Sequence, residues 1–416
     1  MKYVRRIVDD ELAVRLAGTG AVSIEGPRAC GKTATARQIA ASETLLDVDG
    51  NAREAAAIDP ALVLEGPTPR LIDEWQLEPA IWNHVRRAVD ERGQAGQFIL
   101  TGSALAADDA TRHTGAGRIT RMRMRPMTLF ETGGSTGEIS LAGLLGGEPV
   151  GGAKPGLSVA DLARETAIGG WPGFRGLSVE RAVRAVRDYL EEIRRVEVGR
   201  VDQRRRDPNR VGRLLVSLAR NVATNASLST LANDTGGPEG TIGRDTVREY
   251  LDTLERLMIV EDQPAWAPHM RSRYVLRSTP KRHFVDPSLA VAALRATPER
   301  LLSDLNLLGL LFESLVIRDL RVYGQRVDGT VFHYRDSDGL EVDAIVETPA
   351  GGWAAFEIKL GAGRVEEGAR SLEKFIRRID TSRCGGPATL GVIVGTGYGY
   401  TREDGIAVIP IGGLGP

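Results

Sequence analysis

The fold is decided by the stretch Gly26-Pro27-Arg28-Ala29-Cys30-Gly31-Lys32-Thr33, which fits the pattern G-x-x-x-x-G-K-[ST] at every fixed position. Residues 21–25 before it predict a short strand, and residues 33–41 after it predict a helix. In such a loop the backbone N–H groups point at phosphate oxygens, and the helix adds its positive N-terminal dipole. Lys32 would reach the β- and γ-phosphates, and the Thr33 hydroxyl would ligate Mg²⁺. The stretch therefore predicts a site for a nucleoside triphosphate and Mg²⁺.

A second motif lies at residues 70–74, Arg-Leu-Ile-Asp-Glu, where an apolar strand ends in two acids. Asp73 would hold the Mg²⁺ through water. Glu74 would polarise the water that attacks the γ-phosphate, because hydrolysis depends on placing a weak nucleophile in line. An acidic pair at a strand end after such a loop is the Walker B pattern, and it predicts ATP hydrolysis as well as binding.

A third strand, residues 97–100, ends in Thr-Gly-Ser, and either Thr101 or Ser103 would sense the γ-phosphate from its tip. Residues 81–92 have the apolar spacing of a helix, so strands and helices alternate and predict an α/β domain with a parallel sheet. Arg118 begins a segment with one basic face. We expect either a solvated edge strand there or a positive charge brought to the γ-phosphate, within the same chain or from a neighbouring subunit.

Size and composition indicate a soluble protein of two or three domains, with 416 residues, 42% of them hydrophobic, and a net charge of −1. A whole-chain basic excess is absent, so any nucleic-acid surface must be local. Cys30 and Cys384 lie far apart, which excludes a cysteine zinc site and suits a reducing compartment. We expect no signal peptide, because the residues after Met1 are charged and no apolar run follows them. Charges also interrupt the most apolar segment, residues 301–320, so it is not expected to span a membrane. We expect a cytoplasmic protein with no membrane partner.

Composition also predicts the domain boundaries. Residues 132–156 are rich in Gly, Ser, Thr and Pro and predict a flexible linker. They would join a P-loop ATPase domain, residues 1–131, to a helical and winged-helix region, residues 157–285, and a C-terminal α/β domain, residues 286–416.

The middle of the chain carries an arginine-dense helical segment, residues 179–206, with Arg210 and Arg213 just after it. This density predicts contact with a phosphate backbone beyond what a solvated helix face requires. Residues 210–263 follow the order helix, short helix, glycine turn, longer helix and strand, which is typical of a winged helix-turn-helix. DNA is therefore an expected partner, with Arg244, Arg248 and Arg256 on the third helix. The alternative is that the module only packs against protein.

The C-terminal residues predict three successive strands at 331–335, 340–346 and 353–359, after a helix at 303–321. A Glu on a helix, an Asp on a strand and Glu-x-Lys on the next strand resemble the restriction-endonuclease-like (PD-(D/E)xK) nuclease fold. That resemblance implies a divalent metal shared by Asp343 and Glu357, with Glu313 completing its site. Lys359 would orient water or stabilise the transition state, since residues two apart on a strand share a face. The alternative is a nuclease-like module that does not cut.

The N-terminal motifs together resemble those of predicted AAA+-type ATPases of bacteria and archaea that carry a C-terminal domain of unknown function. The resemblance rests on Gly-Pro-Arg-x-x-Gly-Lys-Thr, Leu-Ile-Asp-Glu-Trp-Gln, Ile-Leu-Thr-Gly-Ser and Gly-Arg…Met-Thr-Leu-Phe-Glu. It implies that the two Walker motifs bind ATP and Mg²⁺.

Two functional hypotheses follow. In the first, ATP turnover controls how the winged helix and the nuclease-like domain engage DNA, with a homo-oligomer as a further expectation because Arg118 could act between subunits. In the second, the chain is an ATP-dependent molecular switch whose C-terminal domain binds a protein partner and does not cut nucleic acid.

Overall fold

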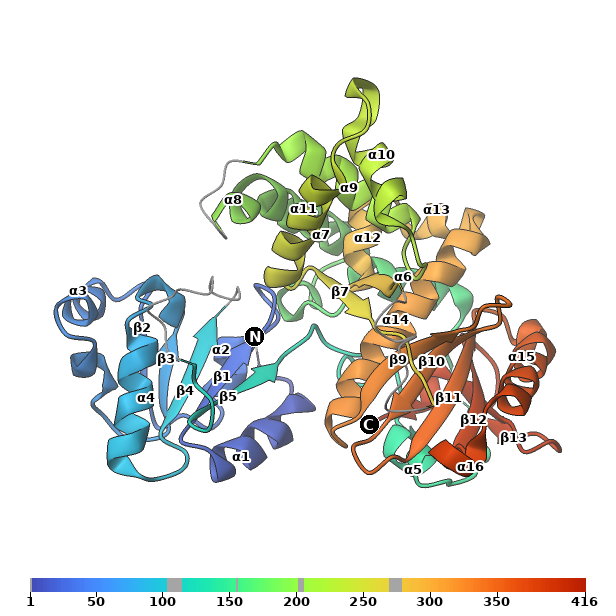
Figure 1. Cartoon of the computed structure of the whole chain (residues 1–416), viewed down its shortest axis with the longest axis horizontal. Coiled ribbons are helices and arrows are strands. Elements are labelled where there is room, and N and C mark those ends of the chain that lie inside the picture. The colour runs from blue at the N-terminus through green and yellow to red at the C-terminus, as the bar shows by residue number, and fades with distance from the viewer. Residues whose placement is uncertain (1, 103–113, 155, 201–205, 269–278) are drawn as a thin grey trace.

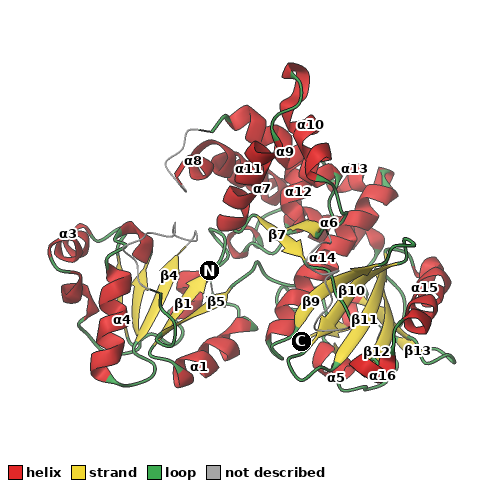
Figure 2. Cartoon of the chain, viewed as in Figure 1, coloured by secondary structure: helices red, strands yellow, loops and turns green. Residues whose placement is uncertain are grey.

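Three parts of the chain are distinct in the computed structural model: an N-terminal domain with a central sheet, a helical middle region and a C-terminal domain with a second sheet (Figure 1, Figure 2). The fold is mixed α/β. The structure describes residues 2–102, 114–154, 156–200, 206–268 and 279–416. No helix within these ranges is long and apolar enough to cross a membrane.

The N-terminal sheet has five parallel strands in the order β2-β3-β4-β1-β5. Parallel strands place their carboxyl ends at one edge, where ligands bind in open α/β sheets. The strands are β1 (Ala21–Glu25), β2 (Ser42–Leu45), β3 (Arg70–Asp73), β4 (Phe98–Gly102) and β5 (Ile119–Arg123). The helices are α1 (Val8–Gly18), α2 (Lys32–Ala36), α3 (Gly50–Ile58) and α4 (Ile81–Arg92). Helix α2 is shorter than the sequence pattern predicts.

The middle region is almost wholly helical (Figure 2). The predicted long helix at 179–206 ends as α7 at Glu192 and continues as a π-helical turn, Ile193–Glu197, and the short helix α8. Its helices are α6 (Val159–Ile168), α7 (Val179–Glu192), α8 (Val198–Arg200), α9 (Pro208–Arg220), α10 (Leu228–Gly236), α11 (Arg244–Arg256), α12 (Pro287–Ala293) and α13 (Pro298–Ser303). Strands β7 (Val260–Gln263) and β8 (Lys281–Phe284) pair antiparallel after α11. This is the element order expected of a winged helix, and the assignment itself stays a prediction.

The C-terminal sheet has six strands in the order β13-β14-β12-β11-β10-β9. The antiparallel strands β9, β10 and β11 continue into the parallel set β11, β12 and β14. Helix α14 (Leu305–Gln325) packs on β9, β10 and β11, and α15 (Val365–Arg378) packs on β10, β11 and β12. The remaining elements are β9 (Thr330–Arg335), β10 (Glu341–Glu347), β11 (Trp353–Lys359), α16 (Thr381–Cys384), β12 (Thr389–Val394), β13 (Tyr400–Thr401), β14 (Ala407–Pro410) and β15 (Leu414–Gly415).

The segment expected to be a flexible linker, residues 132–156, is instead built into the C-terminal domain. It contains β6 (Ile139–Ser140), which pairs with β15, and α5 (Leu141–Leu145), which packs on α14. Buried apolar residues of this segment, Leu141 among them, belong to the same core as α14. Glycine content misled the prediction, because alternating glycines and apolar residues also suit tight turns against a packed core.

A buried ion cluster joins the three parts of the chain. The Arg318 guanidinium of α14 lies 2.8 Å from the Asp286 carboxylate and 2.7 Å from that of Asp319, and all three side chains are buried. Asp286 also accepts the N–H of Gly170, at the turn between α6 and α7. Asp319 accepts the N–H of Leu129, in the segment that leaves the N-terminal domain. One guanidinium therefore holds the middle region and the N-terminal connection against α14.

Replacing Arg318 with Met should destabilise the fold strongly, because Asp286 and Asp319 would be left buried without a cation. Breaking a buried ion pair by removing one partner typically costs about 3–5 kcal/mol. Urea unfolding followed by tryptophan fluorescence measures the loss. The matched control is Arg326→Met, since Arg326 is exposed just after α14. Equal unfolding midpoints for the two variants would contradict the role assigned to the cluster.

Candidate active sites

The loop between β1 and α2 is held in a conformation that its glycines permit. Gly31 has φ +106°, in the left-handed region that favours glycine. A Cβ on Gly26 would lie 2.3 Å from the backbone oxygen of Met124, so only glycine fits there. The Lys32 ammonium donates hydrogen bonds to the backbone oxygens of Gly26 (2.9 Å) and Pro27 (3.0 Å). The Lys32 ammonium thus lies inside the loop, in the place where the phosphates are expected to bind.

The carboxyl ends of β3 and β4 bring the other predicted residues to the same edge. The Thr33 hydroxyl donates to Asp73 Oδ1 at 2.8 Å, and the Thr101 hydroxyl donates to the same oxygen. A hydroxyl and a carboxylate this close suit Mg²⁺, a hard cation that takes oxygen ligands. Glu74 follows β3 with φ +53° and ψ 42°, a left-handed conformation uncommon for a residue other than glycine. Gln76 hydrogen-bonds the Glu74 carboxylate.

Two of the predicted γ-phosphate residues are not at this edge. Ser103 lies outside the described residues. Arg118 precedes Ile119, which pairs with Ala21, the first residue of the parallel strand β1. The loop of residues 26–33, called here the phosphate loop, follows the last residue of β1. The Arg118 guanidinium instead lies 2.8 Å from Asp90 of α4. A contact with the γ-phosphate in the same chain is therefore not formed, because Arg118 sits at the opposite end of the sheet. A contact with a neighbouring subunit stays a prediction.

Residues that the sequence did not single out also hold the loop. Arg6 is buried and donates to the Cys30 oxygen at 2.9 Å. The Tyr189 hydroxyl of α7 donates to the Arg28 oxygen at 3.3 Å, and the Arg28 guanidinium lies 3.2 Å from the Glu197 carboxylate in the π-helical turn. No motif marks these contacts, since they join segments far apart in sequence. The middle region therefore touches the loop directly.

The C-terminal domain brings its four predicted residues together. Glu313 comes from α14, Asp343 from β10, and Glu357 and Lys359 from β11. The Lys359 ammonium lies 2.7 Å from Glu357 and 3.9 Å from Asp343. We call these four residues, together with Lys281, the acidic centre.

Lys281, on β8 of the middle region, was not predicted because its sequence neighbours carry no motif. Its buried ammonium lies 2.9 Å from Glu313 and 3.3 Å from Asp343. Burial raises the pKa of Glu313 to about 8 and that of Glu357 to about 7, against the opposing effect of the lysines. For Asp343 burial also acts to raise the pKa, but Lys281 and Lys359 outweigh it and lower that pKa.

The expected metal site is not formed in this arrangement. Among the residues that the structure describes, no group of three or more His, Cys, Asp or Glu side chains is arranged to hold a metal ion. The physical reason is that protein donors already take one carboxylate oxygen of Glu313 and both oxygens of Asp343 and of Glu357.

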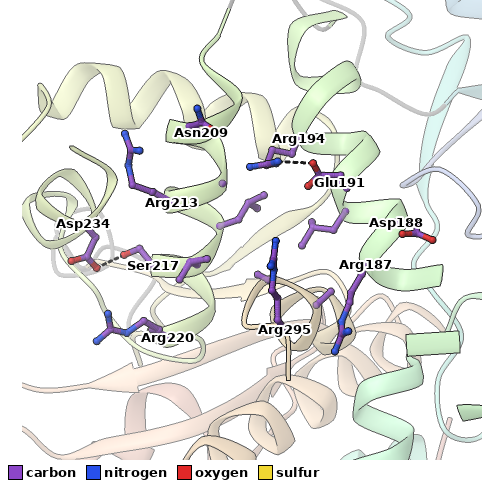
Figure 3. Close-up of a pocket in the computed structure, with 16 residues that line it drawn as sticks. Arg187, Asp188, Glu191, Arg194, Asn209, Arg213, Ser217, Arg220, Asp234 and Arg295 are labelled. Carbon is purple, nitrogen blue, oxygen red and sulfur yellow. Dashed lines mark hydrogen bonds and ion pairs between the residues drawn. The ribbon is translucent and has the colours of Figure 1, made fainter. Parts of the chain in front are cut away.

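A cavity of about 730 Å³ lies in the middle region and is lined by α7, α9, one residue of α10 and the end of α12 with Arg295 after it. Figure 3 shows Arg213 and Arg220 on one helix, Arg187 and Arg194 on the facing helix, and Arg295 between them. The acids that line the cavity are fewer, and two of them are engaged: Glu191 pairs with Arg194, and Asp234 accepts the Ser217 hydroxyl. The lining therefore carries a net positive charge. We call it the arginine cavity.

Comparison with known proteins agrees with the N-terminal site. Residues 18–133 match the family model of an AAA domain. Residues 159–300 and 308–414 match the models of two domains of unknown function, DUF8612 and DUF4143. No curated protein sequence matches the chain. The AAA match and the geometry of the loop support ATP binding by the N-terminal domain.

Two solved structures are similar to parts of the chain. The Walker-type ATPase PABY2304 of Pyrococcus abyssi is 13% identical, with 69% of this chain and 94% of that chain covered and a TM-score of 0.39. A structure of Drosophila ORC bound to DNA is 12% identical, with 70% of this chain and 85% of that chain covered and a TM-score of 0.19.

Replacing Lys32 with Ala should abolish ATP turnover, because the β- and γ-phosphates lose their cation. Replacing Glu74 with Gln should leave ATP bound but not hydrolysed, because the attacking water loses its base. Phosphate release and retention of radiolabelled ATP on a filter separate the two effects. Lys154→Ala, outside this edge, is the control. Full ATPase activity in Lys32→Ala would contradict the assignment of the loop.

Proposed function

We propose that this chain hydrolyses ATP and uses the turnover to control how its middle region binds DNA. The observation that carries the proposal is the arrangement of Lys32, Thr33, Asp73 and Thr101 around one sheet edge, with Glu74 next to it. In this cycle Lys32 moves from the loop oxygens to the phosphates. Thr33 and Asp73 would hold Mg²⁺, which would supply positive charge to the phosphate oxygens. Glu74 orients the water, and Thr101 fixes the Asp73 carboxylate.

The contact between the loop and the middle region supports coupling. Arg28 belongs to the phosphate loop, yet its guanidinium pairs with Glu197 and its backbone oxygen accepts the Tyr189 hydroxyl. Incoming phosphates add negative charge beside Arg28 and compete with Glu197 for it. Binding and release of ATP would therefore alter the hold of the loop on α7 and the π-helical turn.

The arginine cavity supports DNA as the partner. Arg213 and Arg220 are seven residues apart on α9, so they lie about 10 Å apart along the helix axis. One phosphate cannot span that distance, whereas a nucleic-acid backbone presents phosphates along a line. Aromatic side chains are absent from the described lining, which favours contact by charge rather than by base stacking. Helix α7 contributes both Arg187 to this cavity and Tyr189 to the loop.

Two further expectations stand as parts of this proposal. The exposed Arg244 and Arg248 of α11 would add phosphate contacts of a winged helix. In a homo-oligomer, the exposed Arg118 would reach the ATP of a neighbouring subunit. The proposal assigns no nuclease step to the acidic centre, because protein donors already engage its carboxylates.

Duplex DNA should bind with an affinity that falls as salt rises, because bound arginines release counterions from the phosphates. The double change Arg213→Ala and Arg220→Ala should weaken binding and reduce the slope of log affinity against log salt by about two, at about one for each lost phosphate contact. Fluorescence anisotropy of a labelled duplex measures both quantities.

The matched control is Arg377→Ala, an exposed arginine of α15 in the C-terminal domain. An equal loss in the control, or a flat salt dependence in the unchanged protein, would contradict DNA as the ligand of the cavity. Saturable binding of an acidic peptide without binding of DNA would favour the alternative function, a switch that binds a protein partner.

A further inference from the structure

The acidic centre receives a residue from outside its own domain. Lys281 begins β8, which pairs with β7 so that Lys281 lies opposite Gln263. Its side chain is only 3% exposed and extends from the middle region to Glu313 of α14 and Asp343 of β10. A lysine carried by one domain therefore lies between two carboxylates of another.

The carboxylate oxygens are already engaged by the protein. Asp343 Oδ1 accepts from Lys281, and Oδ2 accepts the backbone N–H of Ile358 at 2.9 Å. The two oxygens of Glu357 accept from Lys359 at 2.7 Å and from Ser371 at 2.9 Å. Mg²⁺ requires near-octahedral oxygen ligation, and Mn²⁺ also suits oxygen ligands. A divalent ion would have to displace several of these donors.

The net charge of the acidic centre also disfavours a divalent metal ion. Even with all three carboxylates ionised, the two ammonium groups leave the centre with a formal charge of no more than −1, so most of the negative charge that would attract a metal is already balanced. A divalent ion between Glu313 and Asp343 would lie against the Lys281 ammonium in a buried site, where repulsion between like charges is weakly screened. The ammonium and the metal therefore exclude each other.

We propose that Lys281 is the resident cation of the acidic centre and keeps a divalent metal out of it. The middle region thereby closes a site that belongs to the C-terminal domain. Strand β8 is tied to the rest of the middle region, since Arg282 donates to the Ala226 oxygen at 2.8 Å. The proposal is independent of ATP hydrolysis and of DNA binding.

The test is Mn²⁺ binding to the full chain without nucleotide, measured by electron paramagnetic resonance. The unchanged protein should show no Mn²⁺ site that depends on Asp343. Lys281→Met should gain one, with Mn²⁺ binding at least about tenfold tighter because Glu313 and Asp343 lose their cation. Adding Asp343→Asn to Lys281→Met should remove the gain. Lys281→Arg keeps a cation and should gain nothing.

The matched control is Lys374→Met, since Lys374 is exposed and lines, together with Asp343 and Glu357, a second cavity next to the acidic centre. If Lys281→Met does not fold, Lys281→Gln removes the charge while keeping a hydrogen-bond donor, and should show the same gain. An Asp343-dependent site of equal strength in the unchanged protein would overturn the proposal. Folded Lys281 variants that bind no more Mn²⁺ than the unchanged protein would overturn it as well.

Discussion

The Arg318 guanidinium, buried between the carboxylates of Asp286 and Asp319, is the interaction on which the arrangement of the three parts depends. A buried charge is costly unless it is paired and its hydrogen bonds are satisfied. Here each carboxylate also accepts a backbone N–H from another part of the chain, Gly170 in one case and Leu129 in the other. Separating α14 from the middle region or from the N-terminal connection would leave these charges without their partners. The cluster therefore fixes α14 relative to both.

Helix α14 then acts as a common frame for both candidate sites. Five residues before Arg318 it presents Glu313 to the acidic centre, and at its end Gln325 donates to the Arg123 oxygen and to Glu11 of the N-terminal domain. Arg125 pairs with Glu261 at 2.5 Å, which joins the end of the N-terminal sheet to β7. Contacts of this kind let a change at the phosphate loop reach the middle region through packed, hydrogen-bonded elements.

The sequence predicted those features that depend on residues close together in the chain. The phosphate loop, the acidic strand end at Asp73 and Glu74, and strand β11 with its Glu-x-Lys pair all lie where the sequence placed them. Their signals are short-range, because a glycine turn, an apolar run and a period of two each depend on near neighbours. Thr101 joined the same edge for the same reason, since parallel strands align their ends.

Long-range pairing explains what the sequence did not reveal. The basic segment that begins with Arg118 allowed either a solvated edge strand or a contact with the γ-phosphate. Only the register of β5 against β1 shows that Arg118 lies at the far end of the sheet from the loop in its own chain. Residues 132–156 were predicted to be a linker because the elements that they pack against, β15 and α14, are far away in the sequence. Lys281, Tyr189 and Glu197 carry no motif, and their roles arise only when separate domains meet.

The central claim is that phosphate binding at the loop changes the contacts of Arg28 with Tyr189 and Glu197 and so alters the middle region. Hydrogen–deuterium exchange of the full chain, with and without a non-hydrolysable ATP analogue and Mg²⁺, tests it most directly. The account predicts altered exchange in α7 and in the π-helical turn that carries Glu197, in addition to protection of the loop itself. Protection confined to the loop, with α7 and that turn unchanged, would contradict it.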